Sequence, residues 1–193
     1  MVPCDGVVLA GGASRRMGQS KAELLTGSGQ TLLDRAVSVL QRAIAGTVWI
    51  SRPYSYSAVS ARDLVDDRPS AGPLVGIAQA LQASQYALVA VLAVDLPLVP
   101  DSLFTQMYER WSTHCGLAVV YPQSGSISQP LAALWHRRAL PTIEEALKND
   151  RPWPVQKVVS RLSSEHIEVP LDILTNINTP HDWTRFRDAG VAP

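Results

Sequence analysis

Residues 9–21 read LAGGASRRMGQSK, and they directly follow a short apolar run, Gly6-Val7-Val8. An apolar run that ends in a glycine turn is typical of the first strand of an α/β sheet and of the loop after it. Glycines let the backbone approach a ligand, and the N–H groups of such a loop can bind phosphate oxygens. Two arginines and a lysine in the same loop favour a polyphosphate over a single carboxylate as the ligand.

This loop matches neither of two common phosphate-binding motifs. The P-loop has a lysine directly after its second glycine, whereas Gly18 is followed by Gln19. The dinucleotide fingerprint opens directly into a helix, whereas here Gly11 and Gly12 are adjacent and basic residues follow. An ordinary glycine turn with surface cations is the simpler alternative. The whole segment, placed at the end of a first strand, favours a phosphate loop of a third kind.

The composition limits the class of protein. A chain of 193 residues with 46% hydrophobic residues suits one α/β domain over residues 1–193. Seventeen basic and 17 acidic side chains cancel, which argues against nucleic acid or a membrane surface as partner. Cys4 and Cys115 lie far apart in the sequence and show no metal-binding spacing, so they are interpreted as two reduced thiols of a cytoplasmic protein. We expect a cytoplasmic location, because no secretory signal or membrane-spanning apolar stretch is visible.

Predicted strands and helices alternate along the chain. Strands are expected over residues 6–10, 47–51, 64–67, 86–94, 117–121, 131–135 and 166–169. Helices are expected over residues 31–45, 74–83, 101–111, 138–147, 154–162 and 180–187. Such alternation predicts a doubly wound, mostly parallel, Rossmann-like α/β sheet that is covered by helices on both faces.

Polar residues follow several predicted strands, where ligands bind in sheets of this kind. We expect Gly11, Ser51, Asp67 and Asp95 to line one crevice. Asp95 closes an almost entirely apolar run, and Mg²⁺ would offset the cost of burying its carboxylate. A helix cap or a salt bridge is the alternative for Asp95. Asp67 is interpreted as a nucleoside ligand, with a solvated loop acid as the alternative.

No nucleophile is apparent in the sequence. The histidines show no zinc-binding spacing and no Ser-His-Asp arrangement; they are His114, His136, His166 and His181. A glycine-rich basic loop and an aspartate at a strand end suit phosphoryl or nucleotidyl transfer. That chemistry depends on positioning and charge stabilisation rather than on a covalent intermediate.

These motifs together resemble the molybdenum cofactor guanylyltransferases, within the wider nucleotidyltransferase group, from the N-terminus to about residue 184. The motifs are Leu9-Ala10-Gly11-Gly12, Arg16-Met17-Gly18 with Lys21, Gly72-Pro73-Leu74 with Gly76, Asp95-Leu96-Pro97, and Asn176-Ile177-Asn178-Thr179-Pro180. The first block is specific to the wider group, and the last favours this member of it. The resemblance implies a doubly wound nucleotidyltransferase domain that acts on GTP and molybdenum-loaded molybdopterin, giving molybdopterin guanine dinucleotide and pyrophosphate.

The resemblance also implies roles for individual residues. The guanine or ribose would be contacted by Leu9, Ala10, Gly11 and Gly12. Lys21 would hold the phosphates, with Arg15 or Arg16 assisting. Asp67 would bind the nucleoside, and Asp95 would bind Mg²⁺ and contribute to the nucleotide-binding site.

One residue departs from the family pattern. Members often carry asparagine where this chain has Ser51. Ser51 is therefore predicted to contact the base only because it occupies the position of that asparagine. Cytidylyltransferases tend to have Ala-Ala-Gly at residues 10–12, so the Ala-Gly-Gly found here favours GTP. The roles of Asn176 and Asn178 stay open.

Two rival functions remain. The first is a cytidylyl- or sugar-phosphate nucleotidyltransferase, and the second is a non-catalytic GTP-binding factor that docks onto molybdoenzymes. The presence of both Lys21 and Asp95 favours an enzyme, because binding alone does not require an aligned α-phosphate. The resemblance is also compatible with molybdoenzyme maturation proteins as partners.

Overall fold

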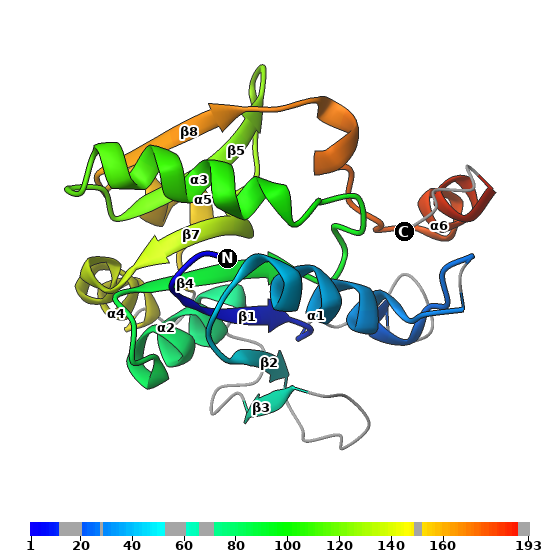
Figure 1. The fold of residues 1–193 in the computed structure, drawn as a ribbon, viewed down its shortest axis with the longest axis horizontal. Coiled ribbons are helices and arrows are strands. Elements are labelled where there is room, and N and C mark those ends of the chain that lie inside the picture. The colour runs from blue at the N-terminus through cyan, green and yellow to red at the C-terminus, as the bar shows by residue number, and fades with distance from the viewer. Residues whose placement is uncertain (12–20, 28, 53–60, 66–71, 149–151, 189–193) are drawn as a thin grey trace.

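The computed structural model describes residues 1–11, 21–27, 29–52, 61–65, 72–148 and 152–188 (Figure 1). The strands are β1 (Asp5–Leu9), β2 (Val48–Arg52), β3 (Arg62–Val65), β4 (Leu88–Ala93), β5 (Val119–Ser124), β6 (Ile127–Ser128), β7 (Ala132–His136) and β8 (Ser164–Glu168). The α-helices are α1 (Leu32–Ala43), α2 (Pro73–Ala83), α3 (Ser102–Thr113), α4 (Leu140–Leu147), α5 (Val155–Val159) and α6 (Pro180–Asp188). Short 3-10 helices are η1 (Lys21–Glu23), η2 (Arg137–Ala139) and η3 (Leu171–Leu174).

The strands form one sheet in the order β3-β2-β1-β4-β7-β5-β6, and β8 pairs with β5. The pairs β3-β2, β2-β1 and β1-β4 are parallel, as is β5-β8. Helix α1 connects β1 to β2, and α2 connects β3 to β4. Parallel neighbours require such crossovers, because a tight turn can only reverse the chain. The predicted doubly wound, mostly parallel sheet is confirmed.

The second half of the sheet is mixed, which the strand predictions did not specify. β7 runs antiparallel to both β4 and β5. The chain leaves β5 through a hairpin to β6, with Gly125 at a φ of 56° in the turn. This conformation suits glycine, and the connection is too short to contain a crossover helix. The reversal therefore follows directly from the turn at residues 124–127.

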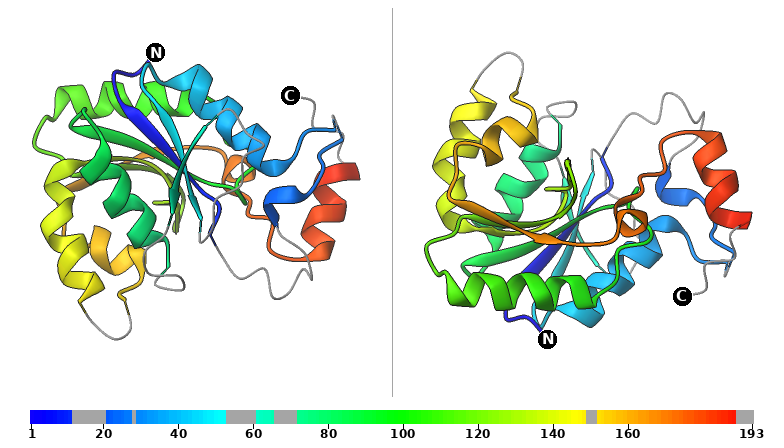
Figure 2. Two further views of the ribbon diagram at one scale, coloured as in Figure 1. Left: turned by 90° about the horizontal axis from the view of Figure 1, so that it is seen from below. Right: turned by 90° about the horizontal axis from the view of Figure 1, so that it is seen from above.

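The sheet is covered on both faces (Figure 2). α1 and α3 pack on one face against Val8, Leu92 and neighbouring apolar residues. α2, α4 and α5 pack on the other face against Val7, Val91 and their neighbours. Adjacent residues of β1 and of β4 thus point to opposite faces, as the period of a strand requires. Burial on both faces explains why β4 is apolar throughout.

α6 lies apart from these two layers. Both views of Figure 2 place it beside the segment that follows residue 20, coloured blue. Trp183 and Phe186 of α6 are partly buried and pack against the core on the α1 side of the sheet. In the described parts of the chain, every helix is too short or too polar to cross a membrane.

Candidate active site

The carboxyl ends of three parallel strands meet at one edge of the sheet. Leu9 at the end of β1 lies opposite Ser51 of β2 on one side and Ala93 of β4 on the other. The pairing continues past β1, because the Ala10 N–H donates to the Ser51 carbonyl at 2.9 Å and the Val94 N–H donates to the Leu9 carbonyl at 3.2 Å. At this edge, the residues that follow β1 and those that follow β4 therefore lie close to one another.

Of the residues predicted to bind the nucleotide, three lie at the carboxyl end of β1: Leu9 is its last residue, and Ala10 and Gly11 follow it. Leu9 is buried, Ala10 is half-buried, and Gly11 is exposed at the edge of the sheet. Gly12, Arg15, Arg16 and Asp67 lie outside the described residues. The roles given to all of these residues stay predictions.

Ser51 is buried beneath α2. Its side chain faces Gly76, in the second turn of that helix. A Cβ atom added to Gly76 would overlap the Ser51 Oγ and lie 2.7 Å from the Ser51 Cβ and 2.9 Å from the Leu9 Cδ2. Only a residue without a side chain lets the helix lie this close to the strand ends. The predicted base contact at Ser51 stays a prediction.

Lys21 and Asp95 come together at the strand ends from positions far apart in the sequence. Lys21 begins η1, and its Nζ lies 3.5 Å from the Asp95 Oδ2. Both side chains are largely enclosed, with 17% of Lys21 and 20% of Asp95 exposed. An ion pair removed from most of the solvent is less screened than a surface pair. The structure thus joins the two residues that were predicted to bind phosphates and metal.

Asn178 completes this cluster, although sequence reasoning gave it no role. The Lys21 Nζ donates to the Asn178 Oδ1 at 2.6 Å. The preceding residue is anchored as well, because the Ile177 N–H donates to the backbone carbonyl of Asp95 at 2.9 Å. The Asn-Ile-Asn-Thr-Pro motif was the available signal, but it did not indicate which residues the asparagines contact.

The other asparagine of the motif has a different partner. The Asn176 Oδ1 accepts a hydrogen bond of 2.8 Å from the Gln129 Nε2, in the connection between β6 and β7. This bond attaches the segment before α6 to the antiparallel half of the sheet. Asn176 therefore supports the segment, and Asn178 contacts the lysine.

The start of α6 is closed by a reciprocal capping box. The Asp182 N–H donates to the Thr179 Oγ1 at 3.1 Å, and the Thr179 N–H donates to the Asp182 Oδ2 at 2.8 Å. The Asn178 N–H also donates to this carboxylate oxygen, at 3.0 Å. The hydrogen bond from the Asn178 backbone and those from Thr179 stabilise the ionised carboxylate and lower the pKa of Asp182.

The donors at this site suit a metal ion that is shared with a substrate. Within the residues that the structure describes, no three histidine, cysteine, aspartate or glutamate side chains gather into a metal site. Asp95 offers one carboxylate at the cluster. Mg²⁺ is commonly held by one or two carboxylates and takes its remaining ligands from water and phosphate oxygens. Asp95 fits that kind of ion.

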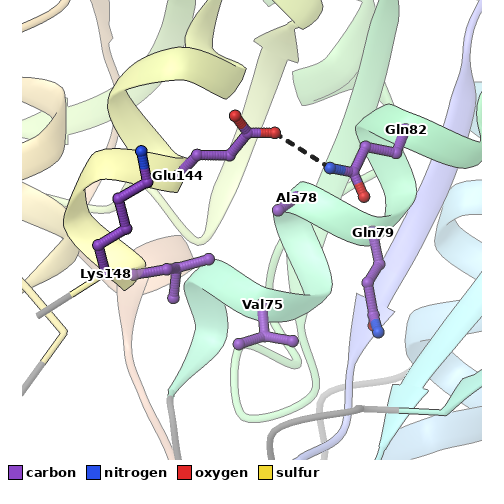
Figure 3. Close-up of a pocket in the computed structure, with 7 residues that line it drawn as sticks. Val75, Ala78, Gln79, Gln82, Glu144 and Lys148 are labelled. Carbon is purple, nitrogen blue, oxygen red and sulfur yellow. Dashed lines mark hydrogen bonds between the residues drawn. The ribbon is translucent and has the colours of Figure 1, made fainter. Parts of the chain in front are cut away.

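A pocket lies between α2 and α4 (Figure 3). Its volume is about 290 Å³, and its lining consists of Val75, Ala78, Gln79, Gln82, Glu144, Leu147 and Lys148. The Gln82 Nε2 of α2 donates to the Glu144 Oε1 of α4 at 3.2 Å. None of the residues predicted from the sequence to form the active site lines this pocket.

A doubly wound sheet that joins a lysine and a carboxylate at its strand ends suits nucleotidyl transfer, which depends on positioning and charge stabilisation. The chain belongs to the MobA-like NTP transferase domain family, whose sequence model matches residues 6–166.

Relatives match along nearly the whole chain. A probable molybdenum cofactor guanylyltransferase of Pelotomaculum thermopropionicum is 32% identical over 197 residues, covering 97% of this chain and 93% of the relative. A protein of the same name from Opitutus terrae is 40% identical over 194 residues, covering 94% of each chain. The crystal structure of molybdopterin-guanine dinucleotide biosynthesis protein A from Archaeoglobus fulgidus has the same fold, with a TM-score of 0.80 and 22% identity over 96% of this chain and 97% of that one.

Proposed function

We propose that this protein transfers GMP from GTP to molybdenum-loaded molybdopterin, forming molybdopterin guanine dinucleotide and pyrophosphate. The relatives named molybdenum cofactor guanylyltransferase support the choice of reaction. The observation that carries it is the meeting of Lys21, Asp95 and Asn178 at the strand ends, where Lys21 is the last residue of the predicted phosphate loop. We also propose that the reaction takes place in the cytoplasm.

The reaction exchanges one phosphoanhydride bond for another. The terminal phosphate oxygen of the pterin substrate attacks the α-phosphorus of GTP in line with the leaving group. A bond forms between that oxygen and the α-phosphorus, and the bond to the bridging oxygen of pyrophosphate breaks. The attacking phosphate is already anionic, so no general base is required. Catalysis then depends on alignment and on stabilising negative charge.

The residues of the cluster fit those two tasks. The Lys21 ammonium supplies positive charge to phosphate oxygens, and the Asn178 amide holds it in place from the side of α6. Asp95 would hold Mg²⁺, and the ion would supply further positive charge at the reacting phosphates. Arg15 and Arg16 are proposed as additional phosphate contacts, and Asp67 as a nucleoside contact.

Pyrophosphate release is the direct test. The protein is incubated with Mg²⁺ and either GTP or CTP, with and without molybdenum-loaded molybdopterin. We expect release with GTP only when the pterin is present, and little release with CTP. Release with CTP and not with GTP would favour the cytidylyl alternative. GTP binding without any release would favour the non-catalytic factor.

Two substitutions test the cluster. We expect Lys21→Ala and Asp95→Asn each to lower kcat by about 100-fold or more. The first removes a positive charge from the reacting phosphates, and the second weakens the binding of the Mg²⁺ that would supply further positive charge there. The controls are Lys148→Ala, at the pocket between α2 and α4, and Asp101→Ala, whose carboxylate pairs with the exposed Arg42 at 2.8 Å. Urea unfolding checks that all four variants fold. Normal turnover in folded Lys21 and Asp95 variants would refute the assignment.

A further inference from the structure

The Asp182 carboxylate in the capping box of α6 accepts one more hydrogen bond than capping of the helix requires. In such a box, a side chain in the first turn binds the backbone N–H of the capping residue. Asp182 does this with the Thr179 N–H, and the same Oδ2 atom also accepts the Asn178 N–H at 3.0 Å. The additional bond falls on the residue whose side chain contacts Lys21. Helix capping and the candidate active site thus share one carboxylate.

We propose that Asp182 is a positioning residue for nucleotidyl transfer: its carboxylate fixes the backbone of Asn178, and Asn178 in turn holds the ammonium group of Lys21 at the strand ends. The inference rests on the proposed function for its effect on catalysis. We call the contacts from Asp182 to Asn178 and from Asn178 to Lys21 the clamp. Its geometry is independent of which nucleotide or acceptor the enzyme uses.

Asn178 is held from both sides along the chain. On one side, the buried Ile177 donates its N–H to the Asp95 carbonyl at 2.9 Å. On the other side, Asp182 accepts the N–H groups of Asn178 and Thr179. Between these anchors the Asn178 Oδ1 accepts from the Lys21 Nζ at 2.6 Å. A side chain whose backbone is fixed on both sides has few positions available, so the lysine meets an acceptor already in place.

Such a clamp matters because a lysine side chain is long and flexible. Lys21 must bring a point charge to one position among the phosphates, and its stem has many rotamers to choose from. A displacement of about 1 Å at a reacting centre can lower a rate by about 100-fold. Removing the clamp leaves Lys21 present and charged but less well placed. The loss should therefore appear mainly in kcat rather than in the KM for GTP.

A double-mutant cycle separates positioning from simple helix capping. The variants are Asp182→Ala, Asn178→Ala and the pair together, with Asp182→Asn as the conservative change. We expect Asp182→Ala to lower kcat by about 10- to 100-fold, and to lower it by no more than about twofold when Asn178 is already alanine. Asp182→Asn keeps an oxygen that can accept both N–H groups, so most of the activity should remain.

The chain offers a matched control in α1. There the Asp34 Oδ2 accepts the Thr31 N–H at 3.2 Å, and the Thr31 Oγ1 accepts the Asp34 N–H at 3.0 Å. Asp34→Ala removes a capping box of the same kind without touching Asn178, so kcat should stay within about twofold of the parent. An equal loss in the Asp34 and Asp182 variants would overturn the proposal. So would an Asp182→Ala effect that is the same with and without Asn178.

A spectroscopic readout keeps this test separate from the proposed function. The ¹³Cε resonance of Lys21, assigned by its loss in Lys21→Arg, is followed in the whole chain without substrate. Asp182→Ala and Asn178→Ala should shift it alike, and amide exchange at Asn178 and Thr179 should accelerate by about tenfold in Asp182→Ala. An inactive parent protein with these shifts intact would refute the function and leave the clamp standing. An active parent with no shifts would refute the clamp.

Discussion

The close approach of α2 to the strand ends can be tested by replacing Gly76 with alanine. The added Cβ atom would overlap the Ser51 Oγ and lie 2.7 Å from the Ser51 Cβ and 2.9 Å from the Leu9 Cδ2. The Ser51 Cβ belongs to a buried residue of β2, so it can move only if the strand moves. The Leu9 Cδ2 is the end of a side chain and can rotate away. The serine therefore decides the outcome.

Two opposing effects set the size of the change. Overpacking a well-filled interior costs about 1–3 kcal/mol, and the rigid neighbour at Gly76 places this site near the upper end. Alanine is better than glycine in a helix by about 1 kcal/mol. We therefore expect Gly76→Ala to lower the free energy of unfolding by about 2 kcal/mol, close to a 30-fold change in the unfolding equilibrium. In a Ser51→Gly background the overlap is gone, and the same change should be neutral or stabilising.

Urea unfolding of the four proteins in this cycle measures the effect, with the slope m checked for constancy. Gly116→Ala is the matched control, because a Cβ atom there meets nothing within 4 Å and should change stability by less than about 0.5 kcal/mol. A Gly76→Ala protein as stable as the parent would refute the reasoning. So would a loss of the same size when Ser51 is glycine.

Further predictions concern Asp5, at the N-terminal end of β1, and the two cysteines. Buried Asp5 accepts hydrogen bonds of 2.7 Å from the Thr47 N–H and from the Ser84 Oγ, so Asp5→Ala should lower the free energy of unfolding by about 3 kcal/mol in urea titrations. Burial raises the pKa of the Cys4 thiol to about 12, whereas Cys115 is exposed. A thiol reagent should therefore label one cysteine in the folded protein and the second only on unfolding; rapid labelling of both would contradict this.

The fold could be predicted because its signals are local. The alternation of apolar runs with helical spacing gave the strands and helices to within a few residues, and the unbroken apolar run of β4 indicated a central strand. The pair β5-β6 and the antiparallel course of β7 were not predicted. β6 has two residues, which is too short to show any periodicity. The direction of β7 follows from the hairpin before it rather than from its own residues.

The candidate site could be predicted only in part, because its decisive contacts join distant positions. Lys21 and Asp95 were each singled out by their local surroundings, and the structure places the Lys21 Nζ 3.5 Å from the Asp95 Oδ2. Asn178 lies 157 positions from Lys21, and its side chain gives no local sign of that partner. Asn178 is brought there by the hydrogen bond from the Ile177 N–H to the backbone carbonyl of Asp95, the residue that also supplies the carboxylate. Asp95 thus fixes the Asn178 segment through its carbonyl and pairs with Lys21 through its side chain. A substitution at Asp95 removes the second contact and leaves the first, which is why we expect such variants to fold and yet fail in transfer.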